Sequence, residues 1–93
     1  MTDPAQAAMR LDRLLVYLRF ARTRSAARAM IEAGTLRCNR RHVARVSETV
    51  SPGDVLTLVI GNDVRVVEVL SLPARRLAPA LARSHYRELD PRG

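Results

Sequence analysis

The chain has 93 residues, 47% of them hydrophobic, which is the size and composition of one small globular domain and not of a disordered chain. All 16 basic residues are arginine, and the formal net charge is +7. A single cysteine excludes an internal disulfide, and no apolar run approaches the roughly 18 residues of a membrane span, so we expect a cytoplasmic protein with no membrane partner.

The positive charge is concentrated in the first half of the chain. Residues 1–45 hold ten arginines against three acidic residues, whereas residues 46–93 hold six of each. The whole net charge therefore belongs to one half. This asymmetry favours a polyanionic partner, above all a nucleic acid, that binds the first half.

The first expected helix begins at Arg10. Four leucines follow at helical spacing and form one apolar stripe: Leu11, Leu14, Leu15 and Leu18. Tyr17 and Phe20 are expected outside this stripe, where packing against a C-terminal helix is a better interpretation than stacking on bases.

A second short helix is expected after a break at residues 21–24. Thr23 or Ser25 suits its N-cap, because a hydroxyl oxygen accepts a hydrogen bond from a free backbone N–H. Gly34 is typical of the position just after a helix end. Arg24 and Arg28 then lie one turn apart on this helix.

After Gly34 the apolar period changes to two, which predicts strands. Asn39 and Arg40 form the expected turn of the first hairpin. The later elements expected, in chain order, are a turn at 51–54, a strand at 55–60, a loop at 61–63, a strand at 64–70 and a helix at 78–89. The expected organisation is one α+β domain over 10–89, with a flexible lead at 1–9 and a tail at 90–93.

Five segments in the same order resemble one known pattern. They are the runs 10–13, 19–26, 31–34 and 37–43, and the Pro-Gly-Asp turn at 52–54. Together they are similar to the RNA-binding module of ribosomal small-subunit protein S4, the alpha-L motif. The wider match, which includes Gly61-Asn62-Asp63 and Tyr86-Arg87-Glu88, is closest to the bacterial heat-shock protein 15 group. The resemblance implies two N-terminal helices packed on a small, mostly antiparallel sheet.

The sequence departs from the family pattern in two places. Arg40 stands where a turn glycine is expected, so an arginine occupies a position that favours positive φ. The long basic C-terminal tail of some members is not found in these 93 residues. In length the chain resembles the short members, which are similar to ribosome quality-control factors.

The predicted RNA-binding residues combine a helix N-terminus, which favours a phosphate, with arginines on both helices and the hairpin. They are Arg10, Arg13, Arg19, Arg22, Thr23, Arg24, Ser25, Arg28, Arg37, Asn39, Arg40, Arg41 and Arg45. For Asn39, a role in a turn is the favoured interpretation. Asp12 is interpreted as a helix-start or arginine-orienting residue.

The predicted function is recognition of structured RNA by shape and phosphate, without catalysis, cofactor or metal. The resemblance points to rRNA, and to peptidyl-tRNA, on the large ribosomal subunit in ribosome rescue or the heat-shock response, with the protein as a monomer. Three alternatives remain. The chain could be a free module for tRNA or a small RNA, the appended domain of an enzyme such as a pseudouridine synthase, or a protein-interaction module. The enzyme alternative requires the chain to be a fragment, because 93 residues leave no room for a catalytic domain; Met1 and the C-terminal run favour an independent protein.

Overall fold

A computed structural model describes residues 8–89. Residues 1–7 of the expected lead at 1–9, and the expected tail at 90–93, lie outside the described residues. The elements, in chain order, are β1 (Met9–Arg10), α1 (Leu11–Tyr17), α2 (Arg24–Glu32), β2 (Arg37–Cys38), β3 (Arg41–His42), β4 (Thr49–Val50), β5 (Val55–Ile60), β6 (Asp63–Val69), α3 (Pro79–Ala82), the 3₁₀ turn η2 (Arg83–His85) and β7 (Tyr86–Leu89).

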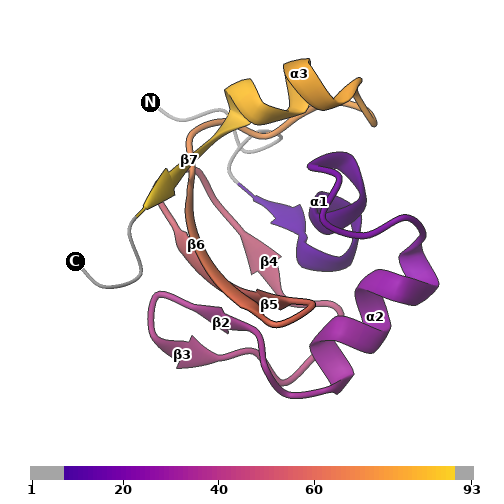
Figure 1. Ribbon diagram of the computed structural model, residues 1–93, viewed down its shortest axis with the longest axis vertical. Coiled ribbons are helices and arrows are strands. Elements are labelled where there is room, and N and C mark those ends of the chain that lie inside the picture. Colours follow the sequence, from indigo (N-terminus) through magenta and orange to yellow (C-terminus); the bar gives the residue numbers. More distant parts are fainter. Residues whose placement is uncertain (1–7, 90–93) are drawn as a thin grey trace.

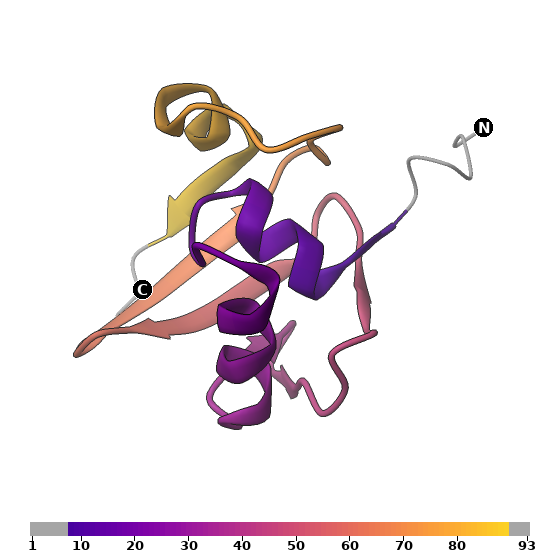
Figure 2. The same cartoon turned by 90° about the vertical axis from the view of Figure 1, so that its right-hand side faces the viewer.

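The fold is α+β, as expected. Five strands form one antiparallel sheet in the order β3-β2-β5-β6-β7, and β1 pairs separately with β4. Helices α1 and α2 lie together on one side of the sheet, and α3 crosses one end of the molecule (Figure 1). The view turned by 90° shows α1 and α2 in front of the curved sheet, with α3 and the β2–β3 hairpin at opposite ends (Figure 2).

The core lies between the leucine stripe of α1 and the inner face of the sheet. The four predicted leucines are buried, and they belong to one cluster with the inward-facing residues of the two longest strands, Leu56, Leu58, Val67 and Val69. Each such side chain contributes about 1.5–3 kcal/mol on burial. This cluster fixes α1 against β5 and β6, and thereby fixes the position of both ends of α1.

The predicted turns contain residues with positive backbone φ. Gly34 ends α2 with φ 80°, and Gly53 takes φ 95° in the Pro-Gly-Asp turn. At the tip of the first hairpin, Asn39 and Arg40 take φ of 53° and 70°, which is the geometry of a type I′ turn. The chain direction at each of these points is therefore the one that the sequence predicted.

The C-terminal helix expected at 78–89 is wrong. The helix α3 spans only Pro79–Ala82, η2 follows, and Tyr86–Leu89 form an edge strand on β6. The helix was expected because Leu81, Tyr86 and Leu89 show a weak helical spacing. Strand pairing with the free edge of β6 determines the structure of this segment instead.

Smaller boundaries also differ. Helix α1 ends at Tyr17, before the expected break, and β1 includes Met9, one residue before the expected domain start. The loop between β5 and β6 has two residues, Gly61 and Asn62, because Asp63 already pairs with Ile60. No helix within residues 8–89 has the length and hydropathy to cross a membrane.

Candidate nucleic-acid interface

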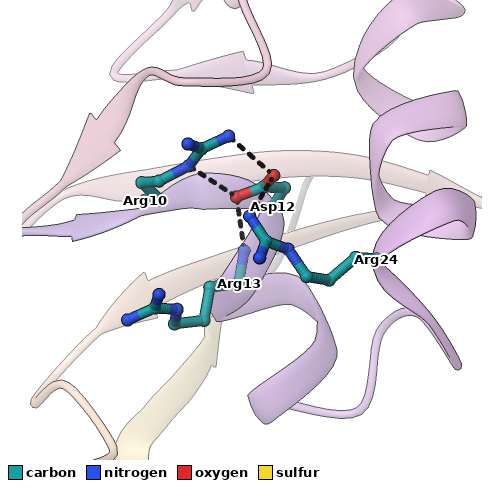
Figure 3. A network of polar contacts seen from close by, with 4 residues as sticks. All are labelled: Arg10, Asp12, Arg13 and Arg24. Carbon is teal, nitrogen blue, oxygen red and sulfur yellow. Dashed lines mark hydrogen bonds and ion pairs between the residues drawn. The ribbon is translucent and has the colours of Figure 1, made fainter.

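A buried carboxylate organises the N-terminal ends of both main helices. Asp12, in the first turn of α1, is fully buried, yet two arginines reach it. The Arg10 guanidinium donates to both carboxylate oxygens, at 3.2 and 3.1 Å, and Arg24 donates to Oδ2 at 3.2 Å (Figure 3). The backbone N–H of Arg13 donates to Oδ1 at 2.8 Å, while the Arg13 side chain points away from the carboxylate (Figure 3).

These contacts determine the charge state of the cluster. Burial alone would raise the pKa of Asp12, but the hydrogen bonds from Arg10, Arg24 and the Arg13 N–H outweigh it and hold the pKa below its usual value. The carboxylate is therefore ionised at neutral pH. Because one negative charge faces two positive ones, the cluster keeps a net charge of +1, with 43% and 54% of the Arg10 and Arg24 side chains exposed.

Arg24 also stands at the N-terminus of α2. Thr23, one of the two residues predicted for the N-cap, caps this helix, and its Oγ1 accepts the Ala26 N–H at 3.1 Å. Arg24 and Ser25 occupy the first two helical positions, whose N–H groups precede the intrahelical ladder. A helix end of this kind carries partial positive charge. Arg24 thus combines a guanidinium held by Asp12 with a place at this helix end.

Side-chain hydrogen bonds of Asn39 and His42 hold the hairpin that carries Arg40. The Asn39 amide donates to Asp54 Oδ1 and its oxygen accepts the Val55 N–H, both at 2.9 Å. His42 Nε2 donates to the Gly34 carbonyl at 2.7 Å, which ties β3 to the end of α2. Asn39 therefore has the structural role favoured from the sequence, although its partners lie in the Pro-Gly-Asp turn and β5, not in its own turn.

Two predicted arginines lie beside an acidic residue. Arg41 forms an ion pair with Glu48 at 2.7 Å, and Glu48 also accepts the backbone N–H groups of Ala44 and Arg45. The hydrogen bond from Arg41, followed by that from Ala44, lowers the pKa of Glu48. Glu48 closes this turn and neutralises part of its charge, so we expect Arg41 to contribute less than Arg40 to any phosphate contact.

The structure separates Arg19 from the other candidates. It lies in the loop after α1 with φ 71°, and its Nε donates to the Leu77 carbonyl at 2.7 Å, on the α3 side of the molecule. The remaining candidate arginines are exposed, and lie on the loop before α2, on α2, on β2 and after β3: Arg22, Arg28, Arg37 and Arg45.

Comparison with known proteins decides the family. The S4 domain model matches residues 9–56, which include α1, α2 and the β2–β3 hairpin. A heat shock protein 15 homolog of Haemophilus influenzae is 36% identical over 86 residues, covering 92% of this chain and 65% of the relative. The homolog of Aeromonas salmonicida is 34% identical over 92 residues, covering 97% and 69% respectively. The chain belongs to the heat shock protein 15 family of S4-domain proteins.

A solved structure agrees with this assignment. The trimeric structure of Vibrio cholerae heat shock protein 15 matches with a TM-score of 0.82 and 34% identity, over 88% of this chain and 82% of that chain. The chain spans just under two thirds of the length of the Haemophilus relative. It carries an RNA-binding S4 domain, and α3 and β7 lie beyond the region that the family model matches.

Three residues that hold this S4 domain together are not among the residues predicted for the site. His42, Glu48 and Asp54 each accept or donate a hydrogen bond that fixes a turn next to a candidate arginine. Only Asp54 had a local signal, since it closes a Pro-Gly-Asp turn and accepts the Ser51 N–H at 2.9 Å. The partners of His42 and Glu48 depend on how α2, the hairpin and β4 meet in space.

Replacing the hairpin arginine should change stability and RNA affinity in opposite directions. Arg40→Gly removes left-handed strain, so we expect the free energy of unfolding to rise by about 1 kcal/mol and the melting temperature by about 4–8 °C. RNA affinity should fall about threefold because one phosphate ligand is lost. Thermal melts and titrations at fixed salt measure both quantities. Arg40→Ala is the matched control: it should lose affinity without gaining stability. Unchanged affinity in both variants would place Arg40 outside the interface.

Proposed function

We propose that this protein binds structured ribosomal RNA, and tRNA held on the large ribosomal subunit, through the basic face formed by α1, α2 and the β2–β3 hairpin. It acts in the cytoplasm by binding, without catalysis, in ribosome rescue or the heat-shock response. Its RNA-binding unit is the monomer. Membership of the S4 family and relatives named heat shock protein 15 support this function.

The observation that carries the proposal is the pair of arginines fixed by one buried carboxylate. Phosphate recognition needs guanidinium groups whose planes are already oriented. Asp12 orients Arg10 and Arg24 through three hydrogen bonds and leaves about half of each side chain exposed. The adjacent N-terminus of α2 adds backbone N–H groups to the same region.

Recognition of this kind suits folded RNA. The deep, narrow groove of an A-form helix hides base edges, so a rigid array of arginines meets phosphates and 2′-hydroxyls instead. The hairpin extends the array because Asn39 and His42 hold it against β5 and the end of α2. We therefore expect affinity for the shape of an RNA helix or junction and little dependence on its sequence.

Crosslinking in cells followed by sequencing of the attached RNA tests the function. We expect ribosomal RNA of the large subunit together with tRNA, and co-sedimentation of the protein with large subunits in a gradient. Recovery of tRNA or a small RNA without subunit association would support a free RNA-binding module. Recovery of messenger RNA alone would contradict the proposal. Light scattering of the free protein and of an RNA-bound sample measures the oligomeric state, which is a trimer in the Vibrio cholerae structure.

A further inference from the structure

The second half of the chain is neutral in sum, but its charges are unevenly placed. Two of its arginines are matched by carboxylates: Arg65 pairs with Glu88 at 2.6 Å, and Arg87 pairs with Glu68. Within residues 8–89, the other arginines of this half form no ion pair; they are Arg75, Arg76 and Arg83. All three are exposed and flank α3. A local excess of positive charge is therefore hidden by the even total.

Arg19 joins this group from the first half of the chain. Its hydrogen bond to the Leu77 carbonyl fixes the loop after α1 against the segment that carries Arg75 and Arg76. The residue holds this place at φ 71°, in the left-handed region that residues other than glycine rarely adopt. Arg19 therefore lies at the same end of the molecule as the segment that leads into α3.

Two of these arginines, Arg19 and Arg83, line a pocket with an aromatic wall, and Arg75 and Arg76 precede the Leu77 carbonyl that Arg19 contacts. The pocket has a volume of about 220 Å³, and its lining includes Arg19, Arg83, Phe20 and Tyr86. The Phe20 and Tyr86 rings lie 5.0 Å apart, and the Arg65 guanidinium covers Phe20 at 5.1 Å from the ring centroid. Both oxygens of Glu88 accept hydrogen bonds from Arg65, so this carboxylate is already paired with Arg65 and not with Arg83.

The size of the pocket limits what it can hold. Sites for whole small molecules or cofactors usually measure about 300–1,000 Å³, so this pocket is too small for a free nucleotide cofactor. One base of a longer strand fits it better, because the strand outside would be held by arginines on the rim. Stacking of a base on an aromatic side chain and phosphate contacts to arginine are the means by which proteins bind single-stranded RNA.

We infer that Arg19, Arg75, Arg76 and Arg83, with the pocket walled by Phe20 and Tyr86, form a second RNA site that binds an unpaired strand. The inference rests on the proposed function. Asp12 lies in the first turn of α1 and Arg19 follows its end, so the two sites are separated by the length of α1, about 10 Å for seven residues. One RNA that has a helix followed by a single-stranded extension reaches both.

Two RNA probes distinguish the sites: a blunt hairpin, and the same hairpin with a six-nucleotide uridine extension. We expect the purified full chain to bind the extended probe about tenfold more tightly than the blunt one. The double variant Arg76→Gln/Arg83→Gln should bring this ratio close to one and leave the affinity for the blunt hairpin within about twofold. Arg87→Gln is the matched control, because it removes an arginine of the same half that is paired with Glu68.

Each other outcome has a distinct meaning. If the extension adds no affinity, or if the double variant weakens both probes equally, the second site is wrong and the first is untouched. If neither probe binds at low salt, the proposed function fails and the second site fails with it. Far-ultraviolet circular dichroism of the variants confirms that they fold, which we expect because both arginines are exposed.

Discussion

The affinity of this protein for a folded RNA should fall on the order of 10³-fold between 50 and 200 mM salt. Arginines that bind phosphates release condensed counterions, and added salt opposes that release. If about six phosphates are neutralised, log K should fall with log[salt] at a slope of about −4 to −5. Equilibrium titrations of a fixed RNA hairpin across this salt range measure the slope directly.

Single variants show which arginines produce the slope. Arg24→Gln should reduce its magnitude by about one, because one phosphate contact is lost, while Arg10 still pairs with the buried carboxylate. Arg87→Gln changes the net charge equally, but Arg87 lies on β7 and is paired with Glu68, so the slope should stay the same. A magnitude near zero for the unmodified protein, or equal reductions in both variants, would argue against a localised basic face.

Asp12→Asn should weaken both the fold and RNA binding, although it raises the net charge by one. The amide still accepts the Arg13 N–H but loses the charge-assisted bonds to Arg10 and Arg24, so we expect a loss of about 2 kcal/mol in the free energy of unfolding. The melting temperature should fall by about 8–16 °C. Charge alone predicts tighter RNA binding, whereas loss of arginine orientation predicts weaker binding; we expect it to be about threefold weaker.

Two comparisons make the Asp12 result decisive. Glu68→Gln removes a carboxylate that pairs with Arg87 away from the basic face, and should leave RNA affinity nearly unchanged. Tighter binding in Asp12→Asn would show that the carboxylate only lowers the local charge.

The pH dependence of stability gives the second comparison. The pKa of Asp12 is lowered by folding, so its contribution is complete above the unfolded value near 3.9 and is lost as the pH falls through the folded value. The stability difference between the two proteins should be constant above about pH 5 and shrink below about pH 4.

The sequence predicted those parts of the fold that local chemistry determines. The leucine stripe of α1, the Thr23 cap, the glycine end of α2 and the Asn39-Arg40 turn are all confirmed, because each depends on residues close together in the chain. The segment 86–89 was predicted as helix because its strand partner, β6, lies about twenty residues away. No local pattern shows which edge of a sheet is open.

The candidate site likewise contains features that the local sequence predicts and features that depend on how distant segments pack. The sequence favours a helix-start or arginine-orienting role for Asp12, but the sharing of Asp12 by Arg10 and Arg24 depends on the packing of α1 against α2. Arg19 was grouped with the basic face because it lies near Arg22 and Arg24 in sequence. A left-handed turn at a residue other than glycine, which the sequence does not signal, directs it toward Leu77 instead.

The attachment of the β2–β3 hairpin has a consequence for local opening. Strand β2 meets β5 through two residue pairs, whereas β5 and β6 share six. Cys38 and Val43 anchor the hairpin in the core, and its remaining contacts include the water-exposed polar bonds made by Asn39 and His42. Segments held in this way open at a lower free energy than the central strands, so their amide hydrogens exchange faster. RNA bound to the hairpin would slow that exchange, while exchange in β5 and β6 would still report unfolding of the whole domain.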